Sequence, residues 1–179
     1  MSNSKLSPKE IRLLLSLAAI NFTHIMDFMI MMPMGDQLMK KLSINPQQFS
    51  LLVASYTIAA GVASFTGTFF VDRFDRKKVL LTCYSGFILG TAVCGLASDY
   101  HFLLAARIMT GLLGGIIGSQ VLSIVGDLIS PENRGKATGF VMTGFSAASV
   151  LGVPVGLWSA SQYGWESPFF GIAVMGFLV

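Results

Sequence analysis

Charged residues are scarce in this sequence. Only 12% of its 179 residues are Asp, Glu, Lys or Arg, while 53% are hydrophobic and the mean hydropathy is +0.69. A soluble domain carries roughly 25% charged residues, so the composition argues against a water-exposed surface and favours lipid as the solvent. The apolar runs are about twenty residues long and continuous, whereas a membrane barrel would need alternating strands of about ten residues. The sequence therefore predicts an all-α membrane protein.

The residues that enzymes and metal sites need are also rare. Cys83 and Cys94 fall in one apolar run, where a helix would hold them about 16 Å apart and unpaired. The second histidine, His101, lies in a predicted outer loop, so we expect no metal site. We find no nucleophile–base pair and no phosphate loop, and the basic residues form no separate face for nucleic acid. The sequence therefore predicts no enzyme, no cofactor and no nucleic-acid partner.

Polar islands divide the chain into six predicted membrane spans that form one bundle over residues 1–179. The sixth span ends at Val179 and offers about twelve residues, or ~18 Å of helix, against a hydrocarbon core of about 30 Å. We therefore expect the sixth span to be truncated. The basic N-terminus leads into the first span without a convincing cleavage site, so this span is predicted to be uncleaved. The spans cover about 11–34, 49–71, 79–97, 102–128, 137–160 and 168–179.

Lysine and arginine are unevenly divided between the two ends of these spans. Nine lie at the N-terminus or in the second-to-third and fourth-to-fifth connections, whereas two lie at the opposite end. Because basic residues favour the cytoplasmic side of a membrane, the N-terminus is predicted to be cytoplasmic.

The spans contain glycine pairs at four-residue spacing. Gly86 and Gly90 form such a pair in the third span, and Gly111 and Gly115 form one in the fourth. Small residues at this spacing let helix backbones approach closely in lipid. We therefore predict that these glycines lie in packing seams.

The connection between the second and third spans carries the clearest motif. Residues 72–78 read Asp-Arg-Phe-Asp-Arg-Lys-Lys, which resembles the signature loop of the major facilitator superfamily: a glycine, three residues, Asp-Arg, one residue and then Gly-Arg-Lys. The charged core matches, whereas Thr68 and Asp75 stand at the two glycine positions. The loop also lies between spans two and three on the predicted cytoplasmic side, where the family requires it.

Two further segments are similar to motifs of the same family. Arg107 and Gly111 match an Arg-x-x-x-Gly core in the fourth span, and Gly152, Pro154 and Gly156 resemble the Gly-Pro-rich motif of proton-driven exporters in the fifth. The latter segment is equally compatible with a plain helix kink. The resemblance covers the whole chain as spans one to six of twelve. It implies a six-transmembrane-helix bundle of the major facilitator type, a 3+3 inverted repeat.

The resemblance also implies a function, that of a secondary transporter. Among subfamilies the chain looks most similar to the bacterial drug and sugar efflux group, the arabinose-efflux-permease-like proteins. Such a protein would lie in the lipid bilayer of the bacterial inner membrane and exchange protons for a small-molecule substrate by alternating access. It would need a second six-helix bundle, either a C-terminal half or a second copy of the chain. An importer of sugars or metabolites, and a non-transporting scaffold or receptor, are the alternatives.

Three ionisable side chains fall inside predicted spans, where they are costly and usually functional. His24 and Asp27 share a face of the first span with Asn21 one turn away, and Arg107 lies in the fourth span. Asp27 and Arg107 are each about 8–10 Å below the outer surface, so they could neutralise each other. We predict that this pair, His24 and Asn21 belong to a proton-coupling and substrate site. A structural ion pair and a packing role for His24 are the alternatives.

The remaining candidate residues form two groups. Gln120 and Phe145 are predicted, from their helix faces, to line the substrate cavity. In the resembling family the loop acid caps a neighbouring helix, and a loop arginine pairs with an acid at the foot of span four; a solvated charged loop is the alternative. The resemblance thus implies a cytoplasmic gating cluster of Asp72, Arg73, Arg76, Lys77, Asp127 and Arg134.

Overall fold

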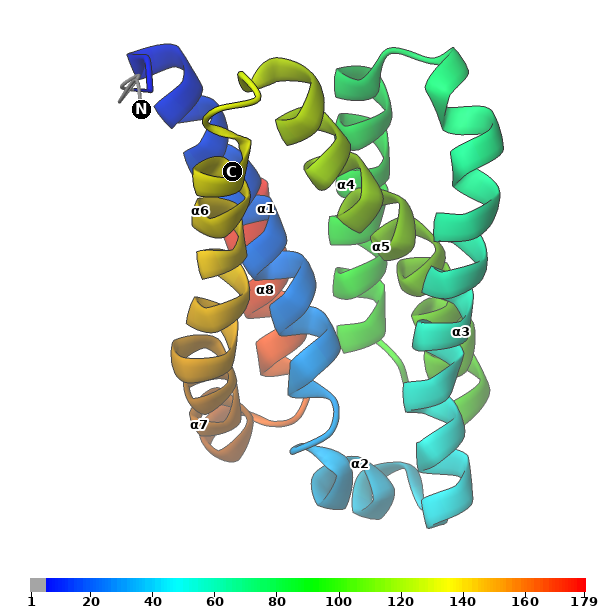
Figure 1. Cartoon of the computed structure of the whole chain (residues 1–179). Coiled ribbons are helices and arrows are strands. Elements are labelled where there is room, and N and C mark those ends of the chain that lie inside the picture. The colour runs from blue at the N-terminus through cyan, green and yellow to red at the C-terminus, as the bar shows by residue number, and fades with distance from the viewer. Residues whose placement is uncertain (1–5) are drawn as a thin grey trace.

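The computed structural model describes residues 6–179, except for the side chains of Phe70 and Asp72, and every regular element in this range is a helix. Five helical stretches are long and apolar enough to cross a membrane, and a sixth has 11 residues, which confirms the predicted all-α membrane fold (Figure 1). The elements are α1 (Pro8–Ile30), α2 (Gly35–Leu42), α3 (Pro46–Phe70), η1 (Val71–Arg73), α4 (Arg76–Gly95), α5 (Tyr100–Leu128), α6 (Arg134–Ala147), η2 (Ala148–Gly152), α7 (Val153–Tyr163) and α8 (Ser167–Phe177).

Helices α1, α3 and α4 begin three residues before the predicted spans, because polar caps precede the apolar runs. At the start of α1 and of α3, Ser7 with Glu10 and Asn45 with Gln48 form capping boxes of reciprocal side-chain and backbone hydrogen bonds. At the start of α4, the carboxylate of Asp75 accepts a backbone N–H at 2.9 Å. A hydropathy pattern detects the apolar run and not its cap, so the predicted starts at 11, 49 and 79 lie inside the helices.

The first predicted span is too long at its outer end. Helix α1 stops at Ile30, whereas the sequence places the end of this span at residue 34. Pro33 explains the stop, because it lacks a backbone N–H and disfavours helical geometry in Met32 before it. After a turn the chain enters α2, a short helix that the sequence did not predict and that lies across the end of the bundle opposite the described N-terminus, between α1 and α3 (Figure 1).

The spans pack as two related triplets. Helix α5 packs against α3 and α4, and α1 packs against the α6–α7 run and α8; α1 also touches α5, and α4 touches α8. In the two repeats, α1 corresponds to α5, α3 corresponds to α6–α7, and α4 corresponds to α8. The contact of α3 with α5 therefore corresponds to the contact of α6 with α1, and the contact of α4 with α5 corresponds to the contact of α8 with α1. Because successive spans alternate in direction, the first and fourth run in opposite senses. This is the pattern of a 3+3 inverted repeat.

Glycine residues allow the helices to approach each other most closely. A Cβ atom added at Gly111 would lie 2.5 Å from the backbone oxygen of Tyr56, and one added at Gly115 would overlap the backbone of Ala60. A Cβ atom added at Gly90 would lie 2.6 Å from a methyl carbon of α5. The predicted seams are thus confirmed for the α3–α5 and α4–α5 contacts, and both of them run along α5.

The ends of the bundle follow the charge pattern. The described part of the N-terminus, the α3–α4 connection and the α5–α6 connection lie at one end, at the top of Figure 1, and α2 lies at the other. The basic residues of the three segments are therefore gathered at one membrane face, as the positive-inside rule requires for a cytoplasmic face.

Candidate functional site

A buried ion pair joins the first and fourth spans. Nη1 of Arg107 on α5 donates to Oδ2 of Asp27 on α1 over 2.8 Å, and the two side chains are 1% and 0% exposed. An unpaired charge at this depth would cost about 3 kcal/mol or more. Since α1 and α5 belong to different three-helix repeats, the pair is an electrostatic link between the two repeats.

The second and third spans complete the surroundings of this pair. Thr91 on α4 donates its hydroxyl to Oδ1 of Asp27 over 3.2 Å. Cζ of Arg107 lies 4.4 Å from the ring centroid of Tyr56 on α3, which is a cation–π arrangement. Among the described residues, nothing hydrogen-bonds to Nε of Arg107. Four spans therefore meet at the ion pair.

Tyr56 and Thr91 were missed by the sequence reasoning. Both are polar side chains in the interior of apolar spans, and their exposures are 3% and 0%. Tyrosine in membrane proteins is enriched at the interfaces, where its hydroxyl reaches water. A tyrosine well inside a span is therefore a signal that the sequence contained and that could have marked Tyr56.

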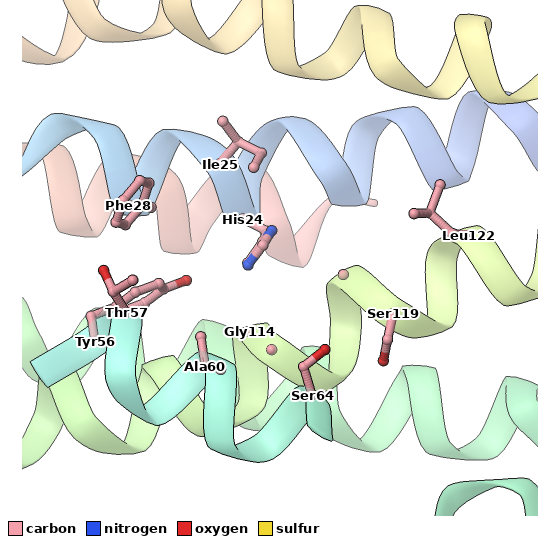
Figure 2. A pocket seen from close by; sticks show the side chains of 13 residues that line it. His24, Ile25, Phe28, Tyr56, Thr57, Ala60, Ser64, Gly114, Ser119 and Leu122 are labelled. Atoms are coloured by element: carbon pink, nitrogen blue, oxygen red, sulfur yellow. The ribbon is translucent and has the colours of Figure 1, made fainter. Parts of the chain in front are cut away.

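His24 lies one helical turn from Asp27 and lines a pocket of about 620 Å³ between α1, α3 and α5 (Figure 2). A Cβ atom added at Gly114 would lie 2.6 Å from Oη of Tyr56 and 2.9 Å from Nε2 of His24, so the two polar groups converge on this glycine. Within the described part of the chain, Oη of Tyr56 and Nδ1 of His24 have no hydrogen-bond partner. The His24 ring also makes an edge contact with Phe87, with 5.7 Å between the ring centroids.

The other predicted cavity residues lie apart from this pocket. Nδ2 of Asn21 donates to the carbonyl oxygen of Val141 over 3.2 Å and so links α1 to α6. Gln120 is buried, and Phe145 on α6 is half-exposed. None of these three side chains belongs to the described lining of the pocket. No cluster of metal-ligating side chains occurs in the part of the chain that the structure describes.

A second ion pair lies at the predicted cytoplasmic end. Nε of Arg76, in the first residue of α4, is 2.5 Å from Oδ2 of Asp127 near the end of α5. The side chains are 32% and 51% exposed, so water reaches both. The pair borders a hollow of about 520 Å³ between α1, α4 and α5. The structure thus brings together two residues of the predicted gating cluster, one from each repeat.

The rest of the predicted gating cluster is arranged differently. Nε of Arg134 donates to the carbonyl oxygen of Ile129 over 3.1 Å, which satisfies a backbone acceptor just after α5. Arg73 and Lys77 are exposed. The side chain of Asp72 lies outside the described residues. The geometry therefore supports a cross-helix contact for Arg76 and Asp127 and a capping contact for Arg134.

The predicted kink in the fifth span contains a π-helical turn. Residues Ala148–Gly152 form η2 between α6 and α7, and Pro154 follows within the first turn of α7. Proline lacks an N–H and crowds the carbonyl four residues earlier, and a π turn relieves that crowding. A Cβ atom added at Gly156 would lie 2.6 Å from Cδ1 of Ile30. The segment is therefore both a break in the helix and a close contact with α1.

The fold and the ion pair define a class of protein, an integral membrane protein of two inverted three-helix repeats with a charge pair inside the membrane. The family model described as Major Facilitator Superfamily matches residues 17–179, and the chain belongs to this superfamily. The superfamily consists of secondary transporters and not of enzymes.

Relatives support this assignment. The uncharacterized MFS-type transporter YhcA of Bacillus subtilis (strain 168) is 27% identical over 93% of this chain and 31% of its own length. The bacillibactin exporter of the same organism is 28% identical over 87% of this chain and 40% of its own length. The crystal structure of a bacterial homolog to the human lysosomal transporter Spinster, inward-facing and unoccupied, matches 97% of this chain and 42% of that chain, with a TM-score of 0.82 and 19% identity. The chain thus spans less than half the length of these proteins.

Proposed function

We propose that this chain is the N-terminal bundle of a proton-coupled antiporter that exports small organic molecules, of the bacterial drug and sugar efflux type. It would act in the inner membrane with its N-terminus in the cytoplasm, as the distribution of basic residues favours. The observation that carries the proposal is the ion pair of Asp27 and Arg107, which is buried between spans of different repeats.

Protonation of Asp27 would change what holds α1 and α5 together. The charged carboxylate neutralises Arg107 and accepts a hydrogen bond from Thr91. A protonated carboxyl group would leave the guanidinium without a counter-charge, so the link between the repeats would weaken. Proton binding would thereby favour a rearrangement of the bundle, and each transport cycle would carry one proton into the cytoplasm as substrate leaves.

The ion pair at the opposite end of α5 would act as a gate. Arg76 and Asp127 join α4 to α5 where the bundle meets the cytoplasm. Rocking of one bundle against another requires such contacts to break and form again. We assign Asp72, Arg73, Lys77 and Arg134 to the same gating region on the resemblance of the loop to the family signature.

Two observations favour export and a second bundle. The segment with Gly152, Pro154 and Gly156 resembles the motif of proton-driven exporters, and one relative is an exporter by name. Alternating access needs a second bundle to rock against, and the matched Spinster homolog has more than twice the length of chain that this bundle covers. The second bundle is either a further part of the same polypeptide or another copy of it.

A pH jump without substrate tests the proton site directly. The protein is reconstituted in liposomes on a solid-supported membrane, and proton binding inside the membrane field then gives a transient current. Asp27→Asn should abolish this current and Asp27→Glu should retain it. Asp36→Asn, which removes an exposed carboxylate on α2, is the control and should leave the current unchanged. A folded Asp27→Asn protein with the full current would refute the proton-coupling role.

The direction of transport is tested in inside-out vesicles with an acidic lumen. An exporter that exchanges protons should release lumenal protons when a transported compound from a panel of aromatic compounds and sugars is added outside, and acridine orange fluorescence should recover. An importer coupled to proton entry gives no recovery in this geometry. A scaffold gives neither recovery nor a pH-jump current.

A further inference from the structure

The pocket between α1, α3 and α5 has the properties of a ligand site, and this inference rests on the proposed transport function. Its volume of about 620 Å³ falls within the range of small-molecule pockets, roughly 300–1,000 Å³. Arg107 and Asp27 do not line it. The pocket is therefore separate from the ion pair, although Tyr56 touches both.

Two polar side chains of the pocket lack a partner. The hydroxyls of Thr57 and Ser119 donate to carbonyl oxygens of their own helices. Oη of Tyr56 and Nδ1 of His24, by contrast, are buried and have no hydrogen-bond partner among the described residues. A buried polar group without a partner costs about 1–3 kcal/mol. Figure 2 shows the two side chains on facing walls, with Tyr56 directed toward His24. Both atoms are closed off from the pocket in this structure, so a ligand with a hydroxyl or carbonyl group would satisfy them after rotation of both rings.

The charge of the ligand follows from the lining. Among the described residues around the pocket, none is an Asp, Glu, Lys or Arg. The nearby charge of Arg107 is already neutralised by Asp27. An ionic ligand would lose part of its hydration without gaining a counter-charge, which is unfavourable. The pocket therefore favours an uncharged molecule.

The shape of the ligand follows from the lining. The rings of Phe28 on α1 and Tyr56 on α3 pack against each other, with centroids 5.5 Å apart and planes inclined by 30°. A Cβ atom added at Gly61 on α3 would meet nothing within 4 Å, and one added at Gly118 on α5 would meet only His24 at 3.8 Å. Aromatic rings beside open space over glycine backbone suit the face of a flat ring.

We infer that this pocket binds an uncharged, planar aromatic compound with one hydrogen-bonding group, packed against Phe28 and Tyr56 in the space over Gly61 and Gly118 and hydrogen-bonded to Tyr56 and His24. Three probes separate the parts of this inference. 2-Naphthol has the flat rings and the hydroxyl. In 2-naphthoate a negatively charged carboxylate replaces the hydroxyl, and 2-decalol keeps the hydroxyl on saturated rings that are not flat.

Equilibrium dialysis against the protein in lipid nanodiscs, with empty nanodiscs as the reference for partition into lipid, measures the binding of each probe. Saturable binding of 2-naphthol is expected, with 2-naphthoate and 2-decalol at least tenfold weaker. Gly61→Leu on α3 and Gly118→Leu on α5 each place a side chain in the pocket and should each weaken 2-naphthol binding at least tenfold. Gly126→Leu, on α5 and outside the pocket with no atom within 4 Å of its added Cβ, is the matched control and should bind as the wild type does.

Equal binding of 2-naphthol and 2-decalol would overturn the preference for a planar ring, and equal binding of 2-naphthoate would overturn the preference for an uncharged molecule. Wild-type binding by both the Gly61 and the Gly118 variants would overturn the location. The pH-jump current needs no ligand, so it reports on proton coupling independently. If the wild-type protein gave the pH-jump current but did not bind 2-naphthol, the ligand site would be rejected and the proton-coupling role would stand. If it bound 2-naphthol but gave no pH-jump current, the proton-coupling role would be rejected and the ligand site would stand.

Discussion

The two ion pairs of this bundle have the same chemistry and lie toward opposite ends of α5. Arg107 with Asp27 is sealed among four spans, whereas Arg76 with Asp127 is open to water. The distances between the charged atoms, 2.8 and 2.5 Å, do not show which pair costs more free energy to break. Burial decides this, because removing one partner of a buried pair leaves an uncompensated charge, while an exposed pair contributes about 0–1 kcal/mol to stability. The buried pair therefore suits a role in which breaking is coupled to proton binding, and the exposed pair suits a gate that opens easily.

The largest expected effect comes from Asp27→Asn. The variant leaves Arg107 buried without a counter-charge, so we expect the free energy of unfolding to fall by about 3–5 kcal/mol. Because Cys83 and Cys94 are both buried, a thiol-reactive fluorogenic dye reports unfolding during a thermal ramp. The double variant Asp27→Asn with Arg107→Gln removes both charges and should recover most of the lost stability. If the double variant were no more stable than Asp27→Asn, the loss could not be assigned to the unpaired arginine.

A smaller effect is expected from the ring beneath Arg107. Tyr56→Leu removes the cation–π contact and should lower stability by about 1 kcal/mol beyond the loss of packing. Tyr56→Phe keeps the ring under the guanidinium and should leave the thermal midpoint close to that of the wild type. The same variant removes the unpaired hydroxyl, so its 2-naphthol binding should weaken several-fold. Equal thermal midpoints for the Leu and Phe variants would mean that the ring contributes nothing to the ion pair.

Composition and periodicity predict much of this fold, because each span carries its own signal. The number of spans, the glycine seams of α5 and the matching depth of Asp27 and Arg107 are all readable from the sequence. The short helix α2 is not, because it lies in a polar connection and does not meet the length expected of a span. The polar caps of α1 and α3 are also invisible to hydropathy, and this shifts the predicted boundaries.

The rotation of a span about its axis is harder to predict than its existence. Helix α3 is apolar on nearly all sides, so no stripe shows which face meets α5. The position of Tyr56 beneath Arg107 depends on that rotation and was therefore missed. For the same reason, Gln120 and Phe145 were placed in a cavity from their sequence spacing, although the structure leaves both outside the pocket that His24 lines. A site made by several spans requires all of their rotations to be known together.

The smallest expected effect concerns the exposed pair. Arg76→Gln should lower the free energy of unfolding by less than about 1 kcal/mol. Salt separates the two pairs further, because the Debye length falls from about 10 Å at 0.1 M to about 3 Å at 1 M, and buried charges are screened much less. The difference between Arg76→Gln and wild type in the thiol-dye assay should therefore shrink at high salt, whereas the difference for Asp27→Asn should persist.

Arg76→Lys should behave like wild type, because an exposed pair needs only a positive charge. Arg107→Lys should not, since a lysine lacks the planar group that lies over Tyr56. A loss of several kcal/mol in Arg76→Gln at high salt would show that the exposed pair mainly stabilises the fold and does not act as a gate.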